Sequence, residues 1–596
     1  MTRKDIDRPP GHREMLRADA ARREILALPP EKALETILDA PDTEALVRSF
    51  AEEDFYFLVH EIGPEDNLPL LAAASPSQWE YLLDLEAWQR DRFDPVAAEH
   101  WLRQLEKAAG PPMVRWLLAE KKDLLDLFLF HGIEVRVREH DQDPSEFGDD
   151  FFTLDDVYYI RVKSSPEALS EAAEKPVDGK EALVRRLLEA IADLDHFIYQ
   201  HELLDAAGLL PAEVEEEAYR LRNVRLAEKG FAPPEEAVGI YQRLAPEALF
   251  QKGRKHLLRE PGPDRQLPAP LFADGMFDAQ GLFARALSAV GSSTALLQLQ
   301  QEFAGLCNRV IAADQTPVRE RESLRAVVEK TAGYLSVGLE HLTGAKKGPP
   351  AVLAARLIEA YPLIELFRVG HGLAMELKWR AGRWRKQSWF EAEANLPLTF
   401  WDEKWVGVIG GLLLSRPRFF DDYRTVDNAY REFASLQDVR ETEQVLDQVI
   451  RTDQVLSHLS LDTAGPRPRN LTYKNLLFTL WASDETGAGL PDSPSSLVPG
   501  VPLEALKRFH RRLFPKGPPA DAGHIRRIAD SVKADFIRWL SGRTGIDPVD
   551  LGEQIGPVLE ALFCELEEEL AAVAAGDLDP RFIRLFLVAR QDAASG

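Results

Sequence analysis

Residues 75–83 read Ser-Pro-Ser-Gln-Trp-Glu-Tyr-Leu-Leu, and this short stretch predicts the architecture of the N-terminal region. A serine accepts hydrogen bonds from the free amides of a first helical turn, and proline fits that turn because its missing N–H would have no partner there. Trp79, Leu82 and Leu83 follow at spacings of three and four, which is typical of a helix with one buried face. The stretch therefore predicts a short amphipathic helix that begins at Pro76.

Similar units recur through the first 130 residues. Each unit begins with a proline, which in most cases stands next to a capping or acidic residue. About ten residues follow, with apolar positions three and four apart. The prolines are Pro30, Pro41, Pro64, Pro76, Pro95 and Pro111. A helix of about ten residues is marginally stable alone, so these units must stack to bury their apolar faces. We therefore predict a mainly α fold, built as a multi-part, solenoid-like helical superhelix with a small β insertion.

Two resemblances rest on these motifs. Residues 28–34 (Leu-Pro-Pro-Glu-Lys-Ala-Leu), 63–68 (Gly-Pro-Glu-Asp-Asn-Leu) and 75–83 resemble the superhelical cytosolic N-terminal domain of bacterial magnesium channel-transporters and the helical domains of the flagellar motor switch. No membrane domain follows, so the resemblance does not imply magnesium transport. The whole chain, including residues 225–231 and 235–237, resembles a family of long bacterial cytoplasmic proteins without an assigned function.

The β insertion is expected between Ile133 and Val162. Ile133, Val135 and Val137 alternate with charged residues, and residues 157–162 are rich in strand formers. The acidic segment 141–150 between them is similar to a calcium loop, but the sixth position of such a loop needs glycine and is Glu146 here. A β-hairpin or small sheet with a solvated acidic turn is the prediction.

Proline-rich and glycine-rich stretches divide the rest of the chain. We predict these segments: a charged N-terminal segment (1–25), a short-helix repeat domain (26–130), the β insertion (131–163), a helical domain (164–260), a central helical domain (261–482), a Pro/Gly/Ser-rich linker (483–502) and a C-terminal helical domain (503–596). Within the last, a helix is expected to begin near Pro557, and another to begin at Pro580.

Composition restricts the class of protein. The chain has 596 residues, of which 45% are hydrophobic and 29% charged, as in ordinary folded soluble proteins. The net charge of −26 disfavours nucleic acid as a partner, because a polyanion would be repelled over most of the surface. Cys307 and Cys564 cannot form a disulfide framework, and the N-terminus lacks the apolar core of a secretion signal. We therefore expect a cytoplasmic protein.

Local signals of chemistry are few. The sequence holds no phosphate-binding loop ending in Lys-Ser or Lys-Thr, no dinucleotide-binding glycine triplet after a strand and no Gly-x-Ser-x-Gly elbow. Cys307 is expected to be a small core residue, and the acidic surroundings of Cys564 disfavour a thiolate. Residues 405–414, the most apolar run, are too short to cross a bilayer and are predicted to be a buried core segment.

One candidate metal site lies on a helix predicted to end near Gly208. Its apolar stripe consists of Val184, Leu187, Ile191, Leu194 and Ile198. The next positions on that stripe are His201 and Asp205, which could bind one metal ion with Glu202 as a base. His196 lies about 140° round the helix from His201 and cannot join them. The alternative is a structural pair, since residues four apart satisfy each other and a histidine near a helix C-terminus is favoured by the dipole.

A second candidate is a basic segment in the otherwise acidic chain. Its members are Lys378, Trp379, Arg380, Arg383, Trp384, Arg385 and Lys386. Guanidinium groups and indoles can hold phosphates and stack on bases, which suits an anionic ligand or a single-stranded nucleic acid. The alternative is a helix end whose tryptophans enter the core while its arginines pair with nearby acids. Residues 506–512, also basic, are interpreted as a solvated helix face or an internal docking surface, with an RNA or phosphate site as the alternative.

Three functions are compatible with these features. The first is a cytoplasmic scaffold or regulatory protein that works through protein–protein interaction, because stacked short helices build long concave surfaces. The alternative is a metal-dependent or phosphate-handling enzyme with a site between helical layers. An adaptor for magnesium transport or motility rests on fold analogy alone. No cofactor and no particular reaction is predicted.

Overall fold

A computed structural model shows a mainly α protein with small two-stranded sheets, as predicted. It describes residues 21–63, 66–140, 142–163, 177–208, 211–257, 279–315, 318, 320–344, 347–424, 428–459, 461, 468, 470–487, 497–515 and 526–589. The chain divides into two compact units, Met1–Gly370 and His371–Gly596. Residues 1–20 of the charged segment, residues 258–278 around the start of the predicted central domain, and residues 488–496 of the predicted linker lie outside the described residues.

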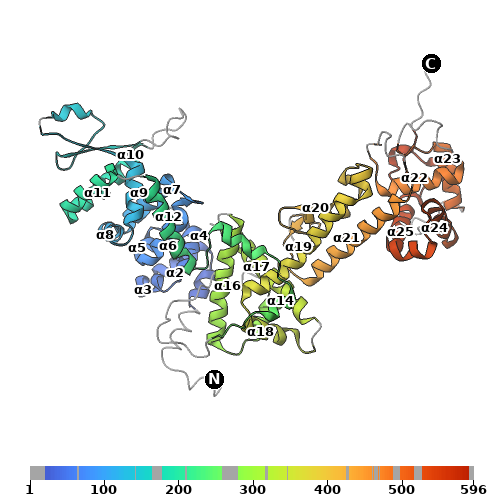
Figure 1. The fold of residues 1–596 in the computed structure, drawn as a ribbon, viewed down its shortest axis with the longest axis horizontal. Helices are drawn as coiled ribbons and strands as arrows, with labels where there is room; N and C mark the ends of the chain where they lie inside the picture. Colours follow the sequence, from blue (N-terminus) through green and yellow to red (C-terminus); the bar gives the residue numbers. More distant parts are fainter. Residues whose placement is uncertain are drawn as a thin grey trace. The chain divides into compact units, whose positions relative to one another are not determined.

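Unit 1 begins with a series of short helices (Figure 1). They are α2 (Pro30–Leu38), α3 (Thr43–Arg48), α4 (Glu52–Ile62), α5 (Leu68–Ala73), α6 (Pro76–Glu86), α7 (Pro95–Ala109), α8 (Pro111–Glu120) and α9 (Lys122–Gly132), with a small hairpin of β1 (Trp88–Gln89) and β2 (Arg92–Phe93) after α6. The predicted starts at Pro30, Pro76, Pro95 and Pro111 are confirmed. Ser75 caps α6 with a full capping box, as its sequence indicates.

Four of these helices differ from the sequence pattern. The helices after Pro41 and Pro64 begin a few residues later, at Thr43 and Leu68. Helices α4 and α9 were not predicted, because neither has a proline in its first turn and the residues that precede them, Ala51 and Lys121, make no side-chain capping bond. Helices of this kind are stabilised by burial of their apolar faces, which local start signals do not report.

The helices from α2 to α9 pack mainly on helices one or two places away in the chain. Phe55, Leu82, Leu102 and Leu125 are fully or almost fully buried between them. Helix α12 (Pro211–Glu228) comes from much later in the chain and packs against α6 and α9 (Figure 1). Contacts with near neighbours are what a stacked helical array requires, and α12 adds one long-range layer to it.

The predicted β-hairpin is confirmed. Strands β3 (Ile133–Val137) and β4 (Tyr158–Val162) pair antiparallel, with Ile133 opposite Val162. A short 3-10 helix, η2 (Pro144–Phe147), lies in the connecting turn and is capped by Asp143. Phe147 stacks on Tyr159 with ring centroids 3.9 Å apart, so a buried ring holds the acidic turn against the strand.

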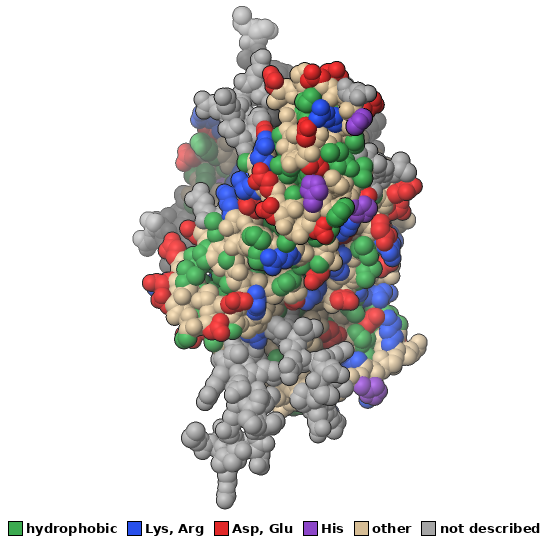
Figure 2. Space-filling model, turned by 90° about the vertical axis from the view of Figure 1, so that its left-hand side faces the viewer, with side chains coloured by type: hydrophobic (Ala, Val, Ile, Leu, Met, Phe, Trp, Pro, Cys, Tyr) green, Lys and Arg blue, Asp and Glu red, His purple; other side chains and the backbone are tan. Residues whose placement is uncertain are grey.

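The helix expected to end near Gly208 is two helices, so its prediction as one helix is wrong. Helix α10 (Val177–Leu194) and helix α11 (His196–Gly208) are separated by Asp195, whose carboxylate accepts a hydrogen bond from the Phe197 amide at 2.8 Å. Leu194 and Ile198 consequently leave the buried stripe, with exposed fractions of 39% and 38%. Figure 2 shows this end of unit 1, where hydrophobic side chains are exposed among charged ones.

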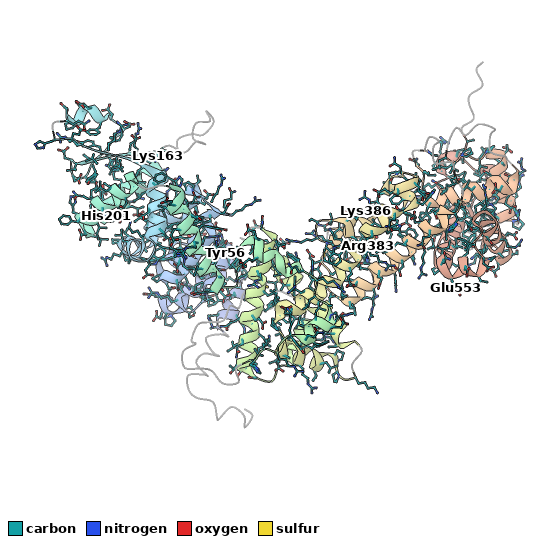
Figure 3. The ribbon with its side chains drawn as sticks, viewed as in Figure 1. Tyr56, Lys163, His201, Arg383, Lys386 and Glu553 are labelled. Atoms are coloured by element: carbon teal, nitrogen blue, oxygen red, sulfur yellow. The ribbon has the colours of Figure 1, made fainter. Side chains whose placement is uncertain are left out.

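The remaining described elements of unit 1 follow α12. They are α13 (Pro234–Ala237), η4 (Val238–Tyr241), α14 (Pro246–Gln251), α15 (Leu282–Ser288), α16 (Ser293–Asp314), α17 (Arg321–Thr343) and α18 (Pro350–Ala360); α19 (Leu363–Gln387) contains the boundary between the units. Cys307 is fully buried in α16, as expected, and burial raises the pKa of its thiol to about 12. Figure 3 shows the side chains on this framework, with Tyr56 on α4 and His201 on α11 labelled.

The turn after α12 lies directly on α16. Gly230 has φ +85°, and a Cβ atom there would lie 2.6 Å from the backbone of Gly305. Next to it, the Asn308 side-chain amide donates to the Lys229 carbonyl at 2.8 Å. Two glycines and one amide therefore fix residues 229–233 against α16.

Unit 2 is also helical. Its elements after α19 are η5 (Trp389–Glu393), η6 (Leu398–Phe400), α20 (Glu403–Leu413), β5 (Phe419–Phe420), β6 (Tyr430–Arg431), α21 (Leu436–Ser457), α22 (Tyr473–Thr486), α23 (Leu503–Leu513), α24 (Asp530–Thr544), α25 (Pro548–Leu570), η7 (Ala575–Asp577) and η8 (Pro580–Phe582). The apolar run 405–414 lies mostly in α20 and contributes buried residues, as predicted. None of the helices described is long and apolar enough to cross a membrane.

Of the two helix starts predicted in unit 2, the one near Pro557 is wrong, and the one at Pro580 begins only a single short turn. Helix α25 begins at Pro548, capped by Asp547, and Pro557 lies inside it. The residues after Asp579 form only the three-residue 3-10 helix η8. An Asp-Pro pair begins both α25 and η8, so this signal marks the start of a helix without fixing its length.

The close approach of Gly230 to Gly305 generates a stability prediction. Gly230→Ala combines left-handed strain with overpacking against backbone, and we expect it to destabilise unit 1 by roughly 2–4 kcal/mol. The measurement is the midpoint of thermal unfolding by calorimetry. Gly239→Ala is the matched control, because a Cβ there meets nothing within 4 Å. Equal midpoints of thermal unfolding for the two variants would contradict the close packing of the turn against α16.

Candidate functional site

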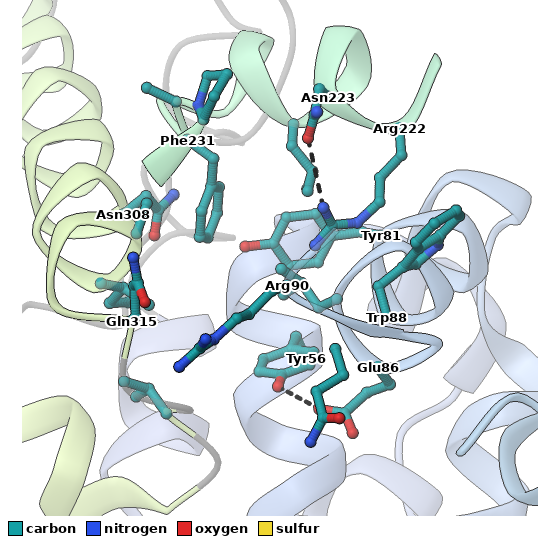
Figure 4. Close-up of a pocket in the computed structure, with 18 of the residues that line it drawn as sticks. Tyr56, Tyr81, Glu86, Trp88, Arg90, Arg222, Asn223, Phe231, Asn308 and Gln315 are labelled. Carbon is teal, nitrogen blue, oxygen red and sulfur yellow. Dashed lines mark hydrogen bonds between the residues drawn. The ribbon is translucent and has the colours of Figure 1, made fainter. Parts of the chain in front are cut away.

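Unit 1 contains a cavity of about 530 Å³ between α4, α6, the β1–β2 turn, α12 and α16 (Figure 4). This volume lies within the range of roughly 300–1,000 Å³ that is common for small-molecule sites. Its walls combine aromatic rings, arginines and side-chain amides. The cavity is the candidate functional site.

Arg90 brings a positive charge into this cavity. It lies in the turn between β1 and β2 with φ +61°, a left-handed conformation that costs a non-glycine residue about 1–2 kcal/mol. Figure 4 shows its side chain extending into the cavity. Arg90 is exposed at the cavity mouth, and its guanidinium forms no hydrogen bond and no ion pair with any described residue.

Arg222 of α12 provides the second guanidinium. Its Nε donates to the Asp84 carbonyl at 2.5 Å, and its Nη1 lies 3.4 Å from the Asn223 side-chain oxygen. The guanidinium carbon is 5.7 Å from the centre of the Trp88 ring, within cation–π range. Burial lowers the pKa of Arg222, while the charge of Asp84 opposes this shift.

A buried ion network fixes Arg222 in place. The Asp84 carboxylate, which is 3% exposed, accepts from Lys121 Nζ at 2.7 Å and from Arg225 Nε and Nη2 at 2.7 and 2.8 Å. Glu80 lies 3.3 Å from Lys121 and 3.2 Å from Arg225. Burial opposes the charge on Arg225, but hydrogen bonds and charge from Asp84 raise its pKa overall. The network joins α6, the end of α8, and α12.

The carboxylates that line the cavity already have hydrogen-bond donors. Glu86 accepts from the Tyr56 hydroxyl at 2.6 Å and from the Trp101 indole at 3.4 Å. His60 Nε2 lies 3.4 Å from the same carboxylate. Asp94 accepts from two backbone amides at the start of α7. Arg90 therefore has no partner among the described residues, and the acids that line the cavity are bound to other groups.

Asn308 contributes a buried acceptor to the cavity wall. The residue is 1% exposed, its Nδ2 donates to the Lys229 carbonyl, and its Oδ1 has no hydrogen-bond partner in the part of the chain that the structure describes. Buried polar atoms in native proteins nearly always have a partner, so an unpaired one at a cavity wall is a candidate ligand contact.

His201 and Asp205 do lie together. His201 Nε2 is 3.6 Å from Asp205 Oδ2, and the His201 side chain is 67% exposed. Lys122 Nζ lies 3.3 Å from Asp205, 2.9 Å from Glu202 and 2.7 Å from Asp126. One ammonium group thus already contacts all three carboxylates. Burial also raises the pKa of Asp126 to about 6.

The described residues offer no third protein ligand for this pair. Among the described residues, no group of three or more His, Cys, Asp or Glu side chains is placed to hold a metal ion. The contacts of His201 and Asp205 agree with the structural interpretation, and a metal role for them stays a prediction.

The basic segment of α19 is divided between several environments. Trp384 is buried and its indole donates to Asp453 at 3.1 Å, whereas Trp379 is 44% exposed. Arg380 pairs with Asp447, and Arg385 pairs with Glu391.

The remaining cations of the basic segment, Lys378, Arg383 and Lys386, do not pair with acids among the described residues. Lys378 donates to the Ser415 carbonyl at 2.9 Å. Arg383 and Lys386, both exposed (Figure 3), make no ion pair or hydrogen bond with the described residues. Most of the cluster therefore matches the alternative of a helix end packed into the core and paired with acids, and anion binding there stays a prediction.

Sequence reasoning missed the cavity. Its residues come from three distant segments, 56–94, 219–233 and 308–318, and no local spacing links them. One signal was available: the segment 225–231, quoted above for a family resemblance, contains Leu226 and Phe231 of the cavity wall.

Comparisons with known proteins give a family but no activity. A family model described as "Family of unknown function (DUF6178)" matches residues 10–589. No curated protein and no solved structure matches the sequence. The resemblance to magnesium channel-transporters therefore gains no support, whereas the resemblance to an uncharacterised family is confirmed. Because the family model covers nearly the whole chain, the protein belongs to the DUF6178 family.

Proposed function

We propose that this protein is a cytoplasmic, helical regulatory protein that binds a small anion in the cavity of unit 1 and acts through protein partners. The observation that carries the proposal is Arg90, a guanidinium without a partner among the described residues that extends into a cavity of about 530 Å³. Two free cysteines without a disulfide are in keeping with a reducing compartment.

The charges around the cavity favour an anion over a cation. Glu86 and Asp94, the acids at the wall, each accept hydrogen bonds from the protein. Arg222 uses Nε and Nη1 within the protein, which leaves Nη2 for a ligand. Guanidinium groups bind carboxylate and phosphate oxygens through parallel N–H donors, so Arg90 and Arg222 together suit such an oxyanion.

The exposed face of α11 supports the protein-partner part of the proposal. Phe197, His201 and Leu204 lie four and three residues apart on that face, with Phe197 81% and Leu204 48% exposed. Tyr199 and Leu203 on the opposite face are fully buried. Exposed apolar side chains gathered on one helix face are typical of interaction surfaces.

An enzyme that uses the same cavity is the second candidate. Glu86 contacts both the Tyr56 hydroxyl and the His60 imidazole, a group of side chains that could transfer protons. Conversion of a bound anion during long incubation, lost in Glu86→Gln, would favour this candidate over pure binding.

The anion proposal is tested with Arg90→Gln. We expect pyrophosphate or citrate at low salt to raise the thermal midpoint of the wild-type protein, and Arg90→Gln to weaken this binding about 10- to 100-fold, because charge-assisted hydrogen bonds are lost. Arg92→Gln is the matched control, since Arg92 is exposed in the same hairpin and does not line the cavity. Equal weakening by both variants, or by neither, would contradict a specific anion site at Arg90.

The partner surface is tested by crosslinking and mass spectrometry. Phe197→Glu combined with Leu204→Glu places charge on the exposed face of α11 and should abolish the crosslinks made from that face. Phe582→Glu, which changes a 75% exposed ring in unit 2, is the control and should leave them unchanged. If the double variant recovers the same crosslinks as the wild type, α11 is not the interface.

A further inference from the structure

Resting on the anion-binding function proposed above, we propose that the ligand is nucleotide-like: a flat nitrogen heterocycle that carries a phosphate group. Three features of the cavity support this class of ligand. They are its aromatic walls, the two guanidinium groups and the buried acceptor of Asn308.

Aromatic rings line the cavity on several sides. Tyr81 of α6 and Phe231 of the turn after α12 have ring centroids 6.4 Å apart, and Trp88 and Tyr219 have centroids 5.8 Å apart. Tyr56 meets Tyr81 edge-on at 5.9 Å. Flat heterocycles stack on such rings, whereas a small inorganic anion would gain nothing from them.

The guanidinium groups provide the phosphate contact. Figure 4 shows Arg90 reaching into the space between the wall of Phe231, Asn308 and Gln315 and the wall of Tyr81 and Trp88. Arg222 lies on the second wall, and its Nη2 has no partner among the described residues. A phosphate accepts through several oxygens, so the Arg90 guanidinium can hold it by charge-assisted hydrogen bonds while Arg222 Nη2 adds a second positive charge to the same cavity.

Asn308 can recognise the edge of the heterocycle. Because its Nδ2 donates to the Lys229 carbonyl, the other atom of the amide must be the oxygen, and this oxygen is the acceptor without a partner among the described residues. An acceptor pairs with an amino group or a ring N–H, which adenine, guanine and cytosine all carry. Gln315, at the end of the same helix, also lines the cavity and has an amide that can both donate and accept.

The experiment is a set of binding titrations on the full chain. The probes are the mononucleotides AMP, GMP and CMP; ribose 5-phosphate and pyrophosphate, which lack the ring; and adenosine, guanosine and cytidine, which lack the charge. We expect at least one mononucleotide to bind tenfold or more tightly than ribose 5-phosphate and than its own nucleoside.

The variant Phe231→Leu distinguishes the contribution of the heterocycle to binding from that of the phosphate. We expect it to weaken mononucleotide binding about 5- to 100-fold through lost stacking, while the affinity for pyrophosphate stays unchanged. Phe582→Leu, which removes an exposed ring in unit 2, should change neither affinity.

The outcomes distinguish the two proposals. If ring-free anions bind as tightly as mononucleotides and Arg90→Gln weakens the binding of both kinds of ligand, the proposal of a heterocyclic ligand is wrong and the proposal of an anion site is supported. If nucleosides bind as tightly as mononucleotides and Arg90→Gln has no effect, the anion site is wrong. If none of the probes binds, both proposals are overturned.

Discussion

The buried carboxylate of Asp84 is the constraint on which the rest of unit 1 depends. It is almost fully buried, and it lies within hydrogen-bond distance of Lys121 and Arg225, which come from the end of α8 and from α12. Breaking a buried pair of this kind typically costs about 3–5 kcal/mol, because the remaining charge stays without compensation. The three charges therefore hold α12 against α6 in one arrangement, although α12 is more than 120 residues further along the chain.

The cavity follows from that arrangement. Arg222 lies one turn from Arg225 on α12, and its Nε is bound to the backbone of Asp84 itself, so one residue fixes both the helix and the cavity wall. The turn that follows α12 is then seated on α16 by Gly230 and Gly305, which places Asn308 at the same cavity. In this region the structural charges are paired, and the guanidinium of Arg90, without a partner among the described residues, faces the cavity.

Sequence reasoning succeeded where structure is set by local interactions and failed where it is set by distant ones. The start of α6 and the β3–β4 hairpin were predicted because capping by Ser75 and alternation along short strands are local. The break at Asp195 was missed, because an acidic residue that caps a helix has the same sequence pattern as one on a helix surface. The cavity was missed because its residues meet only after α12 and α16 pack, and the Asp84 network has no spacing that a single sequence reveals.

The most direct test of the central claim is amide hydrogen exchange of Asp84→Asn, followed by mass spectrometry. The account predicts that protection falls across α12 and residues 229–233, while α21 and α25 of unit 2 keep their protection. Asp193→Asn, at an exposed acid of α10 for which no partner is found among the described residues, should exchange like the wild type. Unchanged protection of α12 in Asp84→Asn would contradict the claim that the buried ion network holds α12 and shapes the cavity.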